Sequence, residues 1–250
     1  MNKKNVLIVA GSDSIGGAGV QADIKSCEAF GCFSASVITA VTAQNTNGVS
    51  SVLAMPASIV KAQFEMVLAE LDIDAVKVGM LFNEEIIAVV SAFLKEFMAK
   101  NVPVVIDPVC VAKSGAKLLE DGAIEALKEL LKLASVATPN VDEARILGID
   151  FANLPCDMVL KRTKVDEICE DTLYLKGGEV VKFSEELFEP RVMHGAGCSF
   201  SSSLAAILAQ QSDLVSAIKM TKKFVANGIK NAHKSKFGAR LIDHKAGLNG

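Results

Sequence analysis

Short apolar runs alternate with longer amphipathic stretches along the chain, and this alternation constrains the fold more than any other feature. Strand-length apolar runs lie at 6–10, 35–41, 75–80, 102–107, 134–138 and 172–176. Patterns with helical spacing lie at 17–31, 57–70, 83–100, 115–132, 141–147, 198–211 and 213–233. Such an alternation predicts a mostly parallel central sheet with helices on both faces. We therefore expect a three-layer α/β fold.

The length and composition fit one large domain. The chain has 250 residues, half of them hydrophobic, which is enough for a core that needs no disulfide or metal staples. No internal repeat, low-complexity tract or linker divides the sequence. We therefore expect a single domain over residues 1–250.

The charge and the cysteines of the chain indicate which classes of partner and which cellular compartment to expect. The formal net charge is −3 with acids and bases mixed, which argues against nucleic acid as the main partner. No apolar stretch approaches membrane-spanning length, and the five apolar residues before Gly11 are too few for a signal peptide. None of the six cysteines forms a C-x-x-C pair, and most lie in apolar segments. We expect a cytoplasmic protein with reduced thiols and no membrane partner.

Several residues with chemical potential fall at the carboxyl ends of predicted strands. In open α/β sheets this edge is where ligands bind. A random scatter of such residues would not line up in this way, so the alignment predicts a ligand site. The residues at or just beyond a strand end are Gly11, Gln44, Met80, Asp107, Asn140 and Lys176.

A glycine-rich segment starts the predicted helix near 198–211. Gly195, Ala196, Gly197 and Cys198 stand where the first amides of a helix have no internal partner. Together with the helix dipole these amides suit a phosphate, and a thiol in the same turn has its thiolate stabilised. Cys198 could thus act as a base or a nucleophile, whereas a glycine-rich turn before a packing helix is the structural alternative.

A second glycine-rich loop follows the first strand, at 11–19. No Gly-Lys-Ser/Thr follows it, so it is not a P-loop. It also lacks the G-x-G-x-x-G pattern and the acidic residue of a dinucleotide site. The loop alone predicts only a close approach of the backbone to a small ligand.

Both loops belong to an ordered set of blocks that resembles the hydroxymethylpyrimidine/phosphomethylpyrimidine kinases, the thiamine-biosynthesis enzymes of the ribokinase superfamily. The set is far more specific than any one block. The resemblance implies a ribokinase-like fold, ATP and Mg²⁺ as cofactors and a small-molecule pyrimidine substrate, and we expect a homodimer. The blocks lie, in the family's order, at 11–25, 36–46, 76–81, 105–109, 112–115, 138–144, 175–178 and 194–198.

For the substrate, the resemblance implies the set Gly11, Asp23, Gln44, Met80 and Val109. An aminopyrimidine has an edge of adjacent donor and acceptor, which the amide of Gln44 matches with two hydrogen bonds. Met80 and Val109 would sandwich the flat ring. Asp23 would bind the hydroxyl, although an acid in the first turns of a helix also offsets the helix dipole.

For phosphoryl transfer, the amides of 195–198 could hold the transferring group, and Lys176 could contact the nucleotide phosphates. A surface lysine before a turn is the alternative for Lys176. Cys198 replaces the aspartate that is the base in most ribokinase relatives, and the resemblance implies that it accepts or orients the proton of the substrate hydroxymethyl group.

Metal binding is expected from Asn140, Glu143 and Asp107. The resemblance implies that the Asn-x-x-Glu spacing serves near magnesium, which needs few protein carboxylates. A helix cap by Asn140 is an alternative that can hold at the same time. Asp107 could support the metal or the phosphates, or simply form an Asp-Pro turn.

The leading hypothesis is ATP-dependent phosphorylation of 4-amino-5-hydroxymethyl-2-methylpyrimidine and of its monophosphate. A pyridoxal or pyridoxine kinase is the alternative, because its substrate is also a flat ring with a hydroxymethyl arm. The short segment after Gly178 motivates another alternative, a non-catalytic pyrimidine-binding paralogue. A transferase with Cys198 as nucleophile and His194 beside it is least favoured, since the sequence reveals no third group to orient the histidine.

Overall fold

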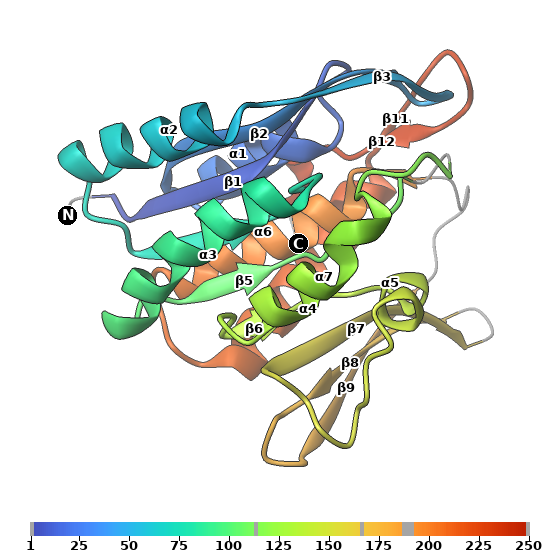
Figure 1. The fold of residues 1–250 in the computed structure, drawn as a ribbon. Helices are drawn as coiled ribbons and strands as arrows, with labels where there is room; N and C mark the ends of the chain where they lie inside the picture. Colours follow the sequence, from blue (N-terminus) through green and yellow to red (C-terminus); the bar gives the residue numbers. More distant parts are fainter. Residues whose placement is uncertain (1–2, 113–114, 166–167, 187–192, 249–250) are drawn as a thin grey trace.

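A computed structural model describes residues 3–112, 115–165, 168–186 and 193–248. Lys113 and Ser114, from the block at 112–115, lie outside the described residues. A nine-stranded sheet runs through the molecule, beside a small three-stranded sheet (Figure 1). The strands of the large sheet are β1 (Asn5–Asp13), β2 (Phe33–Asn45), β3 (Gly48–Ala54), β4 (Ala75–Val78), β5 (Val104–Ile106), β6 (Val136–Ala137), β7 (Asp157–Val165), β8 (Ile168–Tyr174) and β9 (Val180–Glu186).

The large sheet is mostly parallel, as predicted. Its strands follow the order β3-β2-β1-β4-β5-β6-β7-β8-β9. The pairings from β2 across to β7 are parallel, and β3, β8 and β9 are added antiparallel at the two sides. The carboxyl ends of the parallel strands therefore share one edge of the sheet.

Helices cover both faces of the sheet. They are α1 (Gly19–Ala29), α2 (Ala57–Glu70), α3 (Glu84–Ala99), α4 (Ile124–Leu131), α5 (Val141–Ile146), α6 (Ala196–Leu208) and α7 (Leu214–Lys230). One apolar cluster packs α2, α3 and α4 on the sheet and includes Phe64 and Leu94. A second packs α1, α6 and α7 on the other face and includes Leu204 and Ile218. The three-layer α/β fold is confirmed (Figure 1). Among the described residues, no helix is long and apolar enough to cross a membrane.

The structure departs from the predicted elements mainly in the second half of the chain. Only 121–131 of the predicted helix at 115–132 is helical, as a short 3-10 turn followed by α4. β7 was not predicted, because Lys161, Arg162 and Lys164 interrupt its apolar pattern. β3, β9 and the small sheet of β10 (Met193–His194), β12 (Arg240–Leu241) and β11 (His233–Lys234) were also missed. Their short, half-exposed strands give a weak hydrophobic signal.

The predicted strand at 172–176 is β8, and its direction differs from that of the other predicted strands. β8 runs antiparallel to β7, with Tyr174 opposite Met158 near the start of β7. Its carboxyl end therefore lies at the amino edge of the parallel strands, away from the edge expected to bind a ligand.

Candidate active site

A cavity of about 700 Å³ opens at the carboxyl ends of the parallel strands. It is bounded by the loop after β1, by residues that follow β4, β5 and β6, and by the start of α6. Of the residues predicted from sequence, only Asp23 and Lys176 are absent from its wall. Those that line it are Gly11, Gln44, Met80, Asp107, Val109, Asn140, Glu143, Gly195, Ala196, Gly197 and Cys198.

The amides at the start of α6 face the cavity because of Gly195. This N-cap residue has φ 87°, a left-handed conformation that favours glycine. A side chain at Gly195 would also collide with the carbonyl oxygen of Gly17. The first hydrogen bond of the helix runs from Ser199 N to Gly195 O, at 2.9 Å. The amides of 196–198 therefore have no partner within the helix, and they can receive an anion.

Cys198 lies in this first turn and is only partly buried. Burial raises the pKa of its thiol to about 11, although the nearby charge of Lys77 acts in the opposite direction. The prediction that the helix start stabilises the thiolate is therefore wrong. Loss of hydration disfavours the charged thiolate by more than the nearby charge of Lys77 favours it.

The loop at 11–19 is tied to the start of α6 by a buried aspartate. Asp13 accepts hydrogen bonds from the backbone N–H groups of Gly17 and Ala18, and its Oδ2 lies 2.8 Å from His194 Nε2. Although burial opposes ionisation, the bond with His194 and the backbone donors hold the pKa of Asp13 below its usual value. Asp13 is thus the group that orients His194, which the sequence did not reveal.

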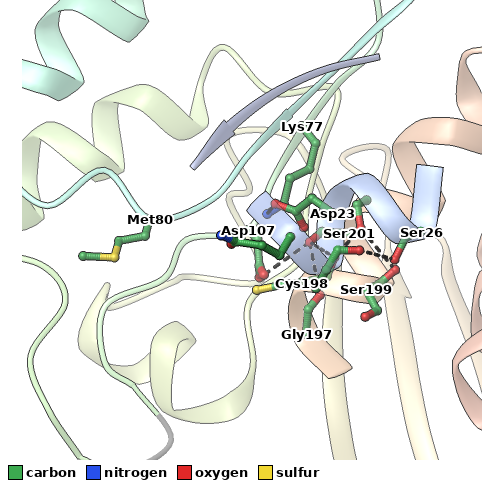
Figure 2. Close-up of polar contacts among 12 residues, drawn as sticks. Asp23, Ser26, Lys77, Met80, Asp107, Gly197, Cys198, Ser199 and Ser201 are labelled. Atoms are coloured by element: carbon green, nitrogen blue, oxygen red, sulfur yellow. Dashed lines mark hydrogen bonds and ion pairs between the residues drawn. The ribbon is translucent and has the colours of Figure 1, made fainter. Parts of the chain in front are cut away.

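Asp23 does not reach the cavity, so the expectation that it lies in position to bind the substrate hydroxyl is wrong. It lies on the buried face of α1 and forms an ion pair with Lys77, with Lys77 Nζ 2.7 Å from Asp23 Oδ2. Both side chains are fully buried, and burial raises the pKa of Asp23 to about 6 despite the charge of Lys77. Figure 2 shows this pair gathered with Asp107 near Cys198.

Lys77 is a cavity residue that sequence reasoning missed. It is the single charged residue of β4, whose other members are Ala75, Val76 and Val78. A lone lysine inside an otherwise apolar strand was the signal that could have identified it, because an unpaired buried ammonium is strongly unfavourable. Its charge lies close enough to Cys198 and Asp107 to act on their protonation.

Lys161 occupies the position that was expected for Lys176. Its Nζ lies 2.6 Å from Asp107 Oδ1, and both side chains are almost fully buried in the cavity wall. Asp107 also accepts hydrogen bonds from Thr138 and Ser201. Burial opposes ionisation of Asp107, but the charges of Lys161 and Lys77 outweigh it and lower its pKa.

Lys176 lies away from this site, and the expectation that it reaches the ligand-binding edge is wrong. It is exposed after the end of β8, and its Nζ donates to the carbonyl of Pro155 at 3.3 Å. The physical reason is the antiparallel direction of β8. The sequence did not predict Lys161 as a site residue, because β7 was not recognised as a strand.

Asn140 and Glu143 form the helix cap that was the alternative to a metal role. Asn140 Oδ1 accepts from Glu143 N at 2.9 Å, and Glu143 Oε2 accepts from Asn140 N at 2.8 Å. Burial raises the pKa of Glu143 to about 7. Within the described residues, no group of three or more His, Cys, Asp or Glu side chains could hold a metal ion.

The residues predicted to bind the substrate ring, with Gly11 beside them, also line the cavity. Gly11 allows Met80 to approach, because a Cβ at this glycine would lie 3.0 Å from Met80 Sδ. The Met80 backbone is fixed by Thr39 Oγ1, which donates to its carbonyl at 2.6 Å. Ser14 Oγ donates to the carbonyl of Gln44 and accepts from its N–H, so both backbone groups of Gln44 are anchored. Val109 lies on the same wall.

Comparison with known proteins shows which family this sequence resembles. The profile of a family described as phosphomethylpyrimidine kinase matches residues 13–243. A hydroxymethylpyrimidine/phosphomethylpyrimidine kinase of Rhizobium meliloti is 40% identical over 93% of this chain and 92% of its own length. The thiamine biosynthesis bifunctional protein ThiED of Geobacter sulfurreducens is 38% identical over 96% of this chain but only 52% of its own length. The chain thus spans about half the length of the bifunctional relatives that it matches.

A solved structure shares the fold over the same extent. Pyridoxal kinase of Bacillus subtilis, in an ADP complex, superimposes with a TM-score of 0.86 and 29% sequence identity. The match covers 98% of both chains. The overall fold of this chain is therefore similar to that of a pyridoxal kinase.

Proposed function

The chain belongs to the phosphomethylpyrimidine kinase family, and from this we propose that it transfers the γ-phosphoryl group of ATP to the hydroxymethyl group of a hydroxymethylpyrimidine. A second transfer, to the monophosphate that results, would give the pyrimidine diphosphate. The relatives that match over nine-tenths of their length carry both activities in their names.

One observation supports this function best. The cavity wall contains two groups of residues: Gln44, Met80 and Val109, here called the neutral side, suit a flat polar ring, and Lys161 with the amides of 196–198, here called the charged side, suits phosphates. On the neutral side, the amide of Gln44 can pair with the donor–acceptor edge of an aminopyrimidine, with Met80 and Val109 against the ring. On the charged side, the amides of 196–198 and Lys161 surround the space where a phosphoryl group would pass.

The charged side supplies electrostatic stabilisation. In phosphoryl transfer, the hydroxyl oxygen attacks phosphorus, the bond to the leaving ADP oxygen breaks, and negative charge spreads over the equatorial oxygens. Preorganised amides at the start of α6 would hold these oxygens without reorganisation. Lys161 would add a positive charge, while Asp107 fixes its position.

Cys198 would receive the proton of the hydroxyl group, which must leave as the new oxygen–phosphorus bond forms. Because the resting thiol has a pKa of about 11, little thiolate exists at neutral pH. In a loose transition state the nucleophile loses its proton late, so a weakly populated base can still serve. The proposal therefore assigns the proton to Cys198 and most of the charge stabilisation to the amides and lysines.

Magnesium would be held mainly by phosphate oxygens and water. The residues present fit this mode, since Glu143 offers a carboxylate at the cavity and Mg²⁺ needs only one or two from the protein. One Glu143 oxygen caps Asn140, which leaves the other available. When bound, the ion would neutralise charge on the nucleotide phosphates. Asp107 is held by Lys161, Thr138 and Ser201, and we propose that it supports the phosphate side through Lys161.

A phosphate-transfer assay tests the function. The purified chain would be given Mg²⁺ and ATP with hydroxymethylpyrimidine, with its monophosphate, or with pyridoxal, and product masses would be measured. We expect the pyrimidine monophosphate and then the diphosphate. Pyridoxal kinase activity is the second candidate because of the fold match to a pyridoxal kinase, and preferential turnover of pyridoxal would favour it.

Two expectations from the sequence stay predictions. We propose a homodimer, which light scattering of the purified chain would test. We also propose a reducing, cytoplasmic location, supported by the six cysteines, which are all free.

A further inference from the structure

Arg162 has an unusual backbone conformation next to the charged side of the cavity. It has φ 61°, in the left-handed region that non-glycine residues rarely adopt. It lies in an irregularity of β7, where the pairing with β8 shifts register between Leu160 and Thr163. Bulges of this kind turn a side chain away from its regular direction, and strained residues of this kind gather at functional sites.

A buried ion pair holds this conformation in place. The N–H of Arg162 donates to Asp171 Oδ1 at 2.7 Å, and Lys222 Nζ lies 2.6 Å from Asp171 Oδ2. Asp171 lies on β8 and Lys222 on α7, and both side chains are almost completely buried. Burying two charges is unfavourable unless their hydrogen bonds are well satisfied. Here the pair also serves to fix one backbone N–H of a strained residue.

Arg162 is an exposed residue that lines the cavity together with Lys161, Glu143 and Gly197. Lys161 and Asn140 form a backbone bridge beside the bulge. Burial raises the pKa of Glu143, and the charges of Lys161 and Arg162 act against that rise, so the guanidinium lies within electrostatic reach. No carboxylate of the described residues lies within ion-pair distance of Arg162, whereas Lys161 is paired with Asp107.

We propose that Arg162 binds a phosphoryl group in the cavity, and that Asp171, held by Lys222, positions it. The proposal rests on the proposed kinase function. A planar guanidinium binds two phosphate oxygens in a fixed, forked geometry, whereas the ammonium of Lys161 acts as a point charge. The phosphate belongs either to the nucleotide or to the pyrimidine monophosphate, which present the same chemistry to an arginine.

The central test replaces Arg162 by glycine. Arg162→Gly removes the guanidinium but suits φ 61°, so the thermal midpoint of unfolding should be unchanged or higher. Titration calorimetry should show that the ligand whose phosphate Arg162 contacts, ADP or the pyrimidine monophosphate, binds more weakly by about 10- to 100-fold, the range for a lost hydrogen bond to a charged group. Arg162→Lys should fall between. Lys176→Met, which removes one exposed positive charge at the opposite edge, is the matched control and should bind ADP as the wild type does.

Kinetics identify which phosphate is bound. A higher KM for ATP with both acceptors assigns Arg162 to the nucleotide. A higher KM for the pyrimidine monophosphate alone assigns it to the acceptor. Unchanged ADP affinity together with unchanged KM values in Arg162→Gly would overturn the proposal. If the wild type binds ADP but phosphorylates no pyrimidine, the proposed function fails, while titrations of wild type and Arg162→Gly with ADP and with the pyrimidine monophosphate still decide whether Arg162 binds a phosphoryl group.

The positioning role of Asp171 needs its own measurement. Asp171→Asn should weaken ADP binding several-fold in the wild type and should add nothing in the Arg162→Gly background, because it acts through Arg162. An equal loss of ADP affinity in both backgrounds would mean that Asp171 acts by another route, and would overturn its assignment as a positioning residue.

Discussion

The two sides of the cavity differ in the kind of side chain that forms them. The side proposed to bind the pyrimidine has neutral groups whose backbones are anchored by single hydroxyls, Thr39 at Met80 and Ser14 at Gln44. The side proposed to bind phosphates has buried charges held in pairs, such as Lys161 with Asp107. A neutral wall can lose one side chain with a local effect. Removal of one member of a buried ion pair has a larger effect, because the other charge is then left buried without its partner.

The largest effect is expected on the phosphate side, from Lys161→Met. The change leaves the carboxylate of Asp107 with a weaker set of partners, and should lower the free energy of unfolding by about 3 kcal/mol as well as abolish transfer. Urea unfolding and the transfer assay would measure both. The double variant Lys161→Met/Asp107→Asn should regain most of the stability but no activity. Activity in the double variant would show that the pair is only structural.

Next in size is Cys198→Ala, which separates the thiol from the amides around it. If Cys198 accepts the proton, kcat should fall by about 10²–10⁴ while pyrimidine affinity is preserved. Because its pKa is about 11, wild-type kcat should also rise with pH between 7 and 9 as the thiolate fraction grows. A Cys198→Ala variant with near-normal kcat would assign catalysis to the amides of 196–198.

Smaller still is the effect expected on the neutral side. Gln44→Ala should weaken pyrimidine binding by about 1–3 kcal/mol, the usual loss when buried hydrogen bonds are left unmade. ADP affinity should stay at its wild-type value and stability should change little, because Asp13, which loses the interaction with Gln44, keeps His194 and two backbone N–H groups as partners. Calorimetry with each ligand would measure this. A comparable loss of ADP affinity would mean that the two sides are not independent.

The contrast between apolar strands and strands that carry buried charges also explains which parts of the site could be predicted from sequence. β1, β4 and β5 are buried parallel strands with mostly apolar sequences, so the residues that follow β4 and β5, among them Met80 and Asp107, were placed correctly in the cavity wall. β7 carries Lys161 and Arg162, and its charges broke the pattern that reveals a buried strand. Lys176 was misplaced because a single sequence does not give the direction of β8. The pairing of Asp23 with Lys77 joins residues from α1 and β4, and no local pattern records such a contact.

The smallest effect is expected from a substitution of Glu143. Its carboxylate caps α5 and also lines the cavity, where it would lie near the phosphates of a bound nucleotide. Glu143→Gln keeps the shape and a cap acceptor, so the fold should be intact. Burial raises the pKa of Glu143 to about 7, so at pH 7 the wild type carries only about half of the charge that the substitution removes. The Mg²⁺ concentration for half-maximal activity should therefore rise only by about 2- to 5-fold, a small electrostatic effect.

The pH dependence of this Mg²⁺ requirement tests the role of Glu143 more sharply. In the wild type, protonation below pH 7 should weaken magnesium binding, and ionisation above it should strengthen binding until a plateau near pH 8. The glutamine variant should show no such change over the same range. A magnesium titration at pH 6, 7 and 8 that is identical in both proteins would leave Glu143 with the helix cap as its only role.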